Sequence, residues 1–137
     1  MENIKIMTQE DKELLFQDLC CRLPYGVKVS IQDITGKYRT ITERVFDTYA
    51  IQFINNNNIL IKPYLRPMSS MTEEEKKEVC SLNGISLIEL NERVKWKNMY
   101  IKAYTIETFD YFNTKHLDYR GLIEKGLALE APKGMYK

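Results

Sequence analysis

The first regular pattern in the chain has the period of a helix. Between residues 9 and 23, large apolar residues recur at the spacing that gives a helix one buried stripe. Thr8 can accept N–H groups of the first turn, and Pro24 disfavours helical backbone at the residue before it. The pattern predicts a helix whose buried stripe is formed by Leu15, Phe16, Leu19 and Leu23.

After Gly26, apolar and polar residues alternate, which is the pattern of half-buried strands. Short links between such strands favour an antiparallel meander. A helix followed by a meander is the order found in small Sm-like and SH3-like barrels, and this is an analogy of arrangement. We expect strands at residues 27–32, 38–46, 49–54 and 59–62, with turns at 33–37 and 55–58.

A segment with two prolines follows the fourth expected strand. Pro63 and Pro67 each remove a backbone donor and fix φ near about −65°, so neither strand nor helix is expected to continue through them. Thr72 and Glu75 then have the spacing of a capping box, which predicts that a helix begins there. The stiff loop before this helix should display Lys62, Tyr64 and Arg66.

The helix that begins at Thr72 is expected to expose its charged residues 73–78 and to end at Gly84. The next segment has mixed signals. Alternation at 94–97 favours a strand, a further strand is expected at 100–104, and a helix over 86–93 stays open.

Two more helices are expected near the C-terminus. Thr105 can cap the first, and Asp118 can cap a shorter one that ends at Gly126. Leu122 and Leu127 have the spacing of the two side chains that touch in a Schellman end. One face of the first helix is expected to carry Ile106, Phe109, Phe112 and His116.

These elements predict an α+β fold. It consists of an N-terminal helix, a small antiparallel barrel-like sheet of four or five strands, and C-terminal helices, in a single domain over residues 1–137. The 44% hydrophobic and 28% charged fractions are those of an ordinary globular protein and exclude wholesale disorder.

Charge and segment composition narrow the functional classes. The net charge of +1 creates no global field that would attract nucleic acid or an anionic membrane. No apolar run approaches membrane-spanning length, and the N-terminus lacks the pattern of a signal peptide. We therefore expect a cytoplasmic protein.

The sequence contains no recognisable catalytic motif. His116 is the single histidine, and no nucleophile or acid can be placed beside it from the sequence. Cys20, Cys21 and Cys80 lack the spacing of metal ligands and read as reduced, semi-buried thiols. The glycines form no phosphate-binding loop. We expect no enzyme activity, no metal and no cofactor.

Two groups of residues are candidates for binding. The first group, Lys62, Tyr64 and Arg66, combines positive charge with an aromatic ring, which suits RNA or single-stranded DNA. The second group, Tyr119 and Arg120, lies at the start of the expected short helix, where free amides favour an anion. Alternatively, the tyrosine packs and the arginine pairs with Asp118 or Glu124.

Three stretches, LPYGV (23–27), LIKPYLRPMSSMTEEE (60–75) and HLDYRGLIEKGLA (116–128), resemble small uncharacterised proteins common in Bacteroides-type gut bacteria and in their prophages and phages. Residues 33–58 and 83–104 resemble nothing recognised. The resemblance implies a phage or mobile-element context in a bacterial cell, and it supplies no activity, fold or site residues.

The sequence therefore predicts a small non-enzymatic accessory protein that binds a macromolecule. A protein partner is favoured over nucleic acid. Binding of RNA or single-stranded DNA by a small barrel is the alternative, and sequestration of a small anionic nucleotide is the third hypothesis. The sequence specifies neither the partner nor the oligomeric state.

Overall fold

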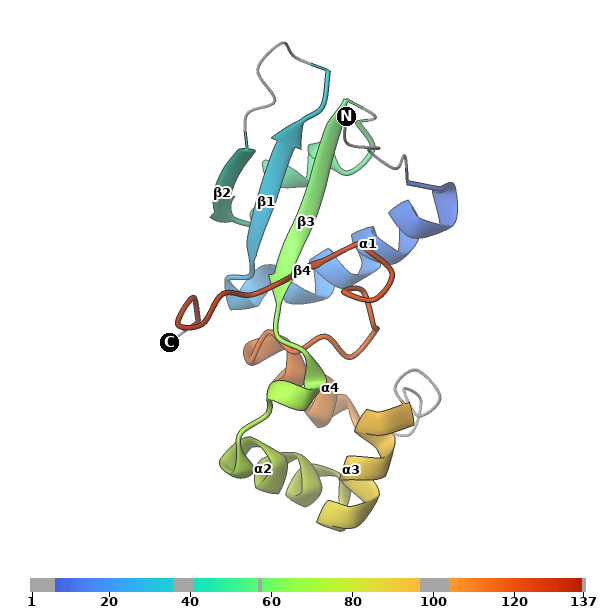
Figure 1. Cartoon of the computed structure of the whole chain (residues 1–137), viewed down its shortest axis with the longest axis vertical. Helices are drawn as coiled ribbons and strands as arrows, with labels where there is room; N and C mark the ends of the chain where they lie inside the picture. The colour runs from blue at the N-terminus through green and yellow to red at the C-terminus, as the bar shows by residue number, and fades with distance from the viewer. Residues whose placement is uncertain (1–6, 36–40, 57, 97–103, 137) are drawn as a thin grey trace.

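The computed structural model describes residues 7–35, 41–56, 58–96 and 104–136. Figure 1 shows a half built from α1 and the strands and a half built from α2, α3 and α4. The fold is α+β, with the expected N-terminal helix and C-terminal helices. In chain order its elements are α1 (Gln9–Arg22), η1 (Leu23–Tyr25), β1 (Lys28–Asp33), β2 (Ile41–Val45), η2 (Ala50–Phe53), β3 (Ile59–Leu65), η3 (Met68–Ser70), α2 (Glu73–Asn83), α3 (Leu87–Trp96), α4 (Ile106–Thr114) and β4 (Leu129–Glu130).

The sheet has the strand order β2-β1-β3-β4. β1 is antiparallel to both of its neighbours, whereas β4 pairs with β3 in parallel. The sheet is therefore mixed and open, and the expected antiparallel, barrel-like sheet is wrong. Closure of a barrel needs its first and last strands to pair. Here β2 and the two-residue β4 lie at opposite edges and do not pair with each other.

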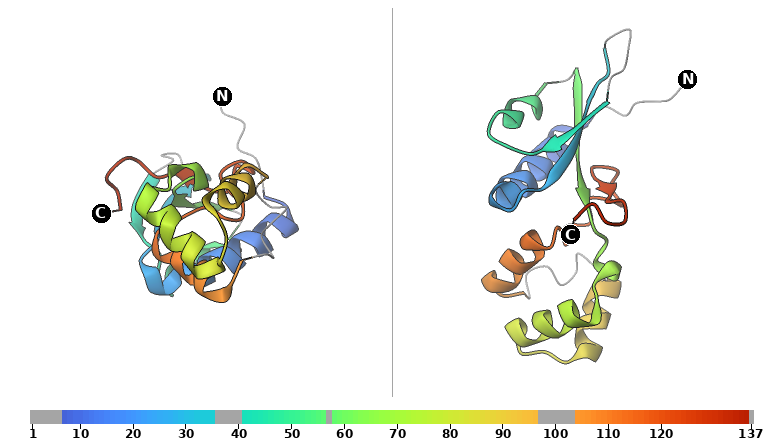
Figure 2. Two further views of the ribbon diagram at one scale, coloured as in Figure 1. Left: turned by 90° about the horizontal axis from the view of Figure 1, so that it is seen from below. Right: turned by 90° about the vertical axis from the view of Figure 1, so that its left-hand side faces the viewer.

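One face of the sheet packs on α1 and η2, which Figure 2 shows on the same side of the strands. The stripe on α1 is confirmed at Leu15 and Leu19, which are fully buried, whereas Phe16 remains 43% exposed. Alternation in β1 and β3 sends every second side chain to this core. The cluster consists of Leu15, Leu19, Val27, Val29, Phe46, Ala50, Ile54, Ile61, Leu65, Leu122, Leu127 and Ala128.

The helical half has an apolar cluster of its own. α2 ends at Gly84, which has the left-handed backbone (φ 62°) that glycine adopts without strain. The Thr105 hydroxyl caps α4 by accepting the Thr108 N–H at 3.2 Å, as the sequence predicts. The cluster consists of Met71, Val79, Leu90, Phe112, Leu117 and Tyr119.

Two expected strands are helical in the structure. The segment 49–54 forms η2, because an Asp47 carboxylate oxygen accepts the Ala50 N–H at 3.0 Å and starts a tight turn. The segment 94–97 falls in α3 as far as Trp96, so the helical alternative for 86–93 is correct. The strand expected at 100–104 lies largely outside the described residues, as does the first part of the strand expected at 38–46.

The prediction that Pro63 ends its strand is also wrong, because β3 continues to Leu65. The Ile34 N–H donates to the Asn58 carbonyl at 3.0 Å, so even-numbered residues of β3 direct their backbone groups toward β1. Pro63 is odd-numbered, so the missing N–H would face away from β1. β3 therefore loses no bond to β1 at this proline.

The segment after Asp118 forms turns in place of the expected short helix. The aspartate still caps it, because its two carboxylate oxygens accept the N–H groups of Leu122 and Ile123 at 2.8 and 2.9 Å. The Leu127 N–H donates to the Leu122 carbonyl, and the Gly126 N–H donates to the Ile123 carbonyl. This is the expected Schellman pattern, and both leucines are buried.

The capping box of α2 is present as predicted. The Thr72 hydroxyl accepts the Glu75 N–H at 3.1 Å, and the Glu75 carboxylate accepts the Thr72 N–H at 2.9 Å. We expect Thr72→Ala to lower the free energy of unfolding by about 1 kcal/mol. Ser81→Ala, at an exposed position of the same helix, is the matched control. Denaturant melts that show equal stability for both variants would contradict the role of the cap.

Candidate functional site

The candidate site is the outer face of the sheet, defined as the face opposite α1 and η2. Cross-strand register places its side chains in three rows. Ile41 at one end and Val45 at the other belong to β2, and Glu43 lies between them. No helix among the described residues covers this face (Figure 2). From β2 to β3, the rows are Ile41, Gln32 and Leu60, then Glu43, Ser30 and Lys62, then Val45 and Lys28 with Tyr64, which is joined to Lys28 through the Tyr136 hydroxyl.

The outer face is most exposed along β2. Ile41 is 62% exposed and Val45 is 49% exposed, although both are β-branched aliphatic residues. Lys62 and Tyr64 of β3 are half-buried. Within the part of the chain that the structure describes, neither Lys62 nor Glu43 forms an ion pair. The face therefore offers apolar surface, one aromatic ring and uncompensated charges.

The C-terminal tail fixes one end of this face. The Tyr136 hydroxyl accepts the Lys28 N–H at 2.9 Å and donates to the Tyr64 carbonyl at 2.7 Å. It thus replaces the ladder bond that β1 and β3 would form with each other at this pair. Burial raises the pKa of Tyr136 to about 12, so the hydroxyl stays protonated and can donate at neutral pH.

The structure separates the three residues that the sequence places on a stiff loop. Lys62 and Tyr64 lie on β3 and share the outer face. Arg66 instead forms two hydrogen bonds with Glu75, at 2.7 and 2.8 Å. These bonds hold the pKa of Glu75 at about 2, so the pair is ionised at neutral pH. The prediction that residues 73–78 are all exposed is wrong at Glu75, which is 8% exposed.

Tyr119 and Arg120 belong to a buried network between α1 and the helical half. The Asp18 carboxylate accepts Arg22 and Arg120 through separate oxygens, both at 2.8 Å. Arg120 also donates to the Tyr119 hydroxyl at 2.9 Å. Tyr119 is 6% exposed, and its ring lies about equally close to both guanidinium groups. The tyrosine packs, as the alternative interpretation stated, but the arginine pairs with Asp18 and not with Asp118 or Glu124.

His116 lies just after α4, outside the helix on which the sequence placed it. Its backbone is left-handed, with φ of 60°, and its ring stacks on Tyr136 at 3.7 Å between centroids. Burial and the nearby cations Arg22, Arg66 and Lys115 lower the pKa of His116 to about 4. A neutral, 8%-exposed imidazole packed on the tail is a structural element of this junction.

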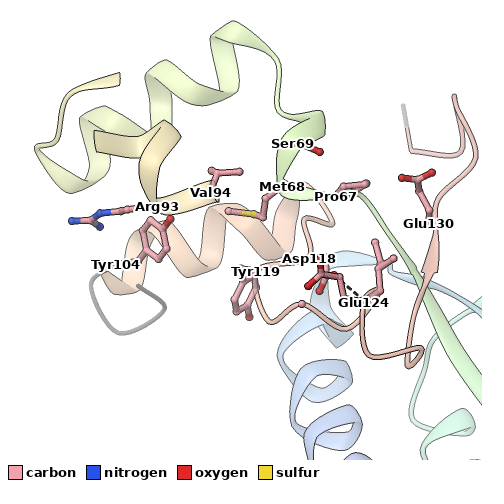
Figure 3. Close-up of a pocket in the computed structure, with 12 residues that line it drawn as sticks. Pro67, Met68, Ser69, Arg93, Val94, Tyr104, Asp118, Tyr119, Glu124 and Glu130 are labelled. Atoms are coloured by element: carbon pink, nitrogen blue, oxygen red, sulfur yellow. Dashed lines mark hydrogen bonds between the residues drawn. The ribbon is translucent and has the colours of Figure 1, made fainter. Parts of the chain in front are cut away.

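A cavity of about 260 Å³ lies between η3, α3 and the segment 118–124 (Figure 3). Tyr104, Met68 and Tyr119 give it an apolar lining. Asp118 is at its wall, but both oxygens of this carboxylate already accept backbone N–H groups. A wider groove of about 840 Å³ between α1 and α4 includes Arg120, whose guanidinium is held by Asp18. Neither cavity presents a free charged side chain from the two predicted binding groups.

Comparisons with known proteins give no further guide. The chain has no significant match to any protein-family model, to any curated protein or to any solved structure. Within the described ranges, no three His, Cys, Asp or Glu side chains are grouped as metal ligands would be. None of the described helices has both the length and the apolar character needed to cross a bilayer.

Proposed function

We propose that this chain is a small accessory protein that binds a protein partner through the outer face of its sheet. The main support is the position of Ile41 and Val45, which are exposed on an edge strand of a face that no described helix covers. Protein interfaces combine such apolar surface with aromatic residues, and Tyr64 supplies an aromatic ring. The partner would belong to a host cell or to a mobile element, in keeping with the resemblance noted above.

RNA or single-stranded DNA is the second candidate, because Lys28 and Lys62 flank Tyr64 on the same face. Phosphate contacts dominate the affinity of such complexes. Glu43 lies on the same face, however, so the two lysines leave this face with a surplus of a single positive charge. Arg66 is already paired with Glu75. We therefore rank a protein partner first.

The double variant Ile41→Lys/Val45→Lys should lose the partner. A tagged chain is isolated with its bound proteins from the source cells, and each protein that depends on these residues is purified and titrated by calorimetry. We expect binding to weaken at least about tenfold, since the loss of a hot-spot residue at the centre of an interface costs about 2 kcal/mol or more. The matched control is Ile88→Lys/Ile106→Lys, which changes two residues that are each 78% exposed in the helical half.

Two results would contradict the proposal. If the control variant loses the partner and the sheet variant keeps it, the interface lies on α3 and α4. If the chain binds a labelled single strand, with an affinity that falls with salt and with Lys62→Ala and Tyr64→Ala, the outer face is a nucleic-acid site.

A further inference from the structure

We propose that β2 adds an extended strand of the partner to the sheet, and that this strand carries a basic residue opposite Glu43 with apolar residues on either side. This inference rests on the proposed function and specifies how the partner is recognised. It is based on which residues of β2 direct their backbone groups away from β1, on the contrast between the two sheet edges, and on the charge pattern of the outer face.

The phase of the ladder shows which backbone groups of β2 are available. The Phe46 N–H donates to the Val27 carbonyl at 2.8 Å, and Arg44 pairs with Val29 in the same register. Even-numbered residues of β2 therefore direct their N–H and C=O groups toward β1. The backbone groups of Ile41, Glu43 and Val45 face the open edge, and no described strand pairs with them.

The opposite edge of the sheet is protected in two ways. Pro63 removes an outward N–H from β3, and β4 pairs with the last two residues of that strand. β2 has neither protection, because it contains no proline and no described strand pairs with its outward side. Its β-branched residues also favour pairing with a further strand. Figure 1 shows β2 at the margin of the sheet, with β1 on its other side. An edge of this kind is a template for another strand.

Charge determines which strand fits. The outward backbone groups and the outer-face side chains belong to the same three residues, Ile41, Glu43 and Val45. If two copies of this chain paired antiparallel through the full length of β2, Glu43 would lie directly opposite Glu43. Like charges at directly opposite positions destabilise a sheet. A partner strand with a basic residue opposite Glu43, and with apolar residues opposite Ile41 and Val45, complements all three positions.

The test uses a soluble peptide with the core Val-Thr-Lys-Thr-Val and a second peptide with glutamate in place of lysine. Each is titrated to millimolar concentration into the isotope-labelled full chain, and amide exchange is followed by NMR. We expect slower exchange at Ile41, Glu43 and Val45. We also expect the lysine peptide to bind about fivefold more tightly than the glutamate peptide. Glu43→Lys should reverse this preference.

A proline variant separates the strand contact from the side-chain contact. Glu43→Pro removes one outward N–H, and the bonds of β2 to β1 are retained, as they are at Pro63 in β3. We expect it to weaken binding of the lysine peptide about tenfold. Glu43→Thr keeps the N–H and removes only the charge, so it should weaken binding by no more than about fivefold. Thermal melts establish that both variants are folded before titration.

The outcomes distinguish the two proposals. If a partner needs Ile41 and Val45 but leaves amide exchange along β2 unchanged, the strand inference is overturned. The proposed function still stands in that case. Concentration-dependent protection of β2 without peptide would show self-pairing and also overturn the inference. If neither peptide slows exchange at millimolar concentration and no protein depends on the outer face, both proposals fail.

Discussion

Replacing Asp18 with alanine is expected to lower the free energy of unfolding by about 3–5 kcal/mol. Asp18 and Arg22 are both fully buried, and the side chain of Arg120 is only 13% exposed. Without the carboxylate, two guanidinium groups would stay near one tyrosine ring with no anion between them. Arg22 would keep its bond to the Leu117 carbonyl at 2.8 Å, which neutralises no charge. Chemical denaturation monitored by circular dichroism measures the loss.

Three controls identify charge as the cause. Asp18→Asn keeps the shape of the side chain and should destabilise nearly as much as Asp18→Ala. Gln17→Ala changes an exposed neighbour on the same helix and should stay within about 0.5 kcal/mol of the wild type. Combining Asp18→Ala with Arg120→Met should cost less than the sum of the single changes by at least about 1 kcal/mol. The network does not hold the two halves together if each single change lowers the free energy of unfolding by less than about 1 kcal/mol and the double variant shows their sum.

The features that the sequence predicted correctly depend on neighbours along the chain. The caps at Thr8, Thr72 and Thr105 each involve residues three positions apart, so the pattern of side chains contains the whole interaction. The Schellman end at Gly126 is local in the same way. The Asp18 network could not be predicted from neighbours along the chain, because Arg120 lies 102 residues away from Asp18. In the sequence, Asp18 and Arg22 have only the spacing of an ordinary surface pair.

The errors in the strand predictions also have physical causes. Composition favours a strand at 49–54, yet Asp47 starts a turn by accepting a backbone N–H group, a capping signal that the aromatic content concealed. Pro63 fits in a strand because of its register, which no local pattern specifies. The candidate site was found in part. Lys62 and Tyr64 lie on the outer face, but the exposure of Ile41 and Val45 depends on strand order, which places β2 at the edge.

Acid should destabilise the fold in two steps that belong to different residues. As the pH falls below about 6.5, the unfolded chain binds a proton at His116, whereas the folded chain binds this proton only near pH 4. The folded state should lose about 3 kcal/mol between these values, and this contribution levels off below pH 4. Glu75 acts at lower pH. Its carboxylate stabilises the fold above its unfolded pKa, and this contribution is lost between about pH 4.5 and about pH 2.

The variant His116→Asn should remove the first step and keep the second. Asparagine tolerates the left-handed backbone that residue 116 adopts, so the change tests the imidazole and not the turn. The readout is the slope of unfolding free energy against pH, which loss of the ring stack on Tyr136 alone would leave unchanged. Glu75→Gln is the reciprocal control and should keep the slope between pH 6.5 and 4.5.

An unchanged slope in His116→Asn would mean that the imidazole takes up its proton at the same pH in both states. The repulsion from Arg22, Arg66 and Lys115 would then be compensated in the folded chain. Arg22 belongs to α1, Arg66 follows β3 and Lys115 follows α4, and Tyr136 of the tail stacks on the ring. Protonation of His116 would therefore add a positive charge where three segments and the tail meet. The acid-induced loss should accordingly appear in both halves of the fold at the same pH, and NMR signals from Leu19 and Phe112, one in each apolar cluster, can follow it.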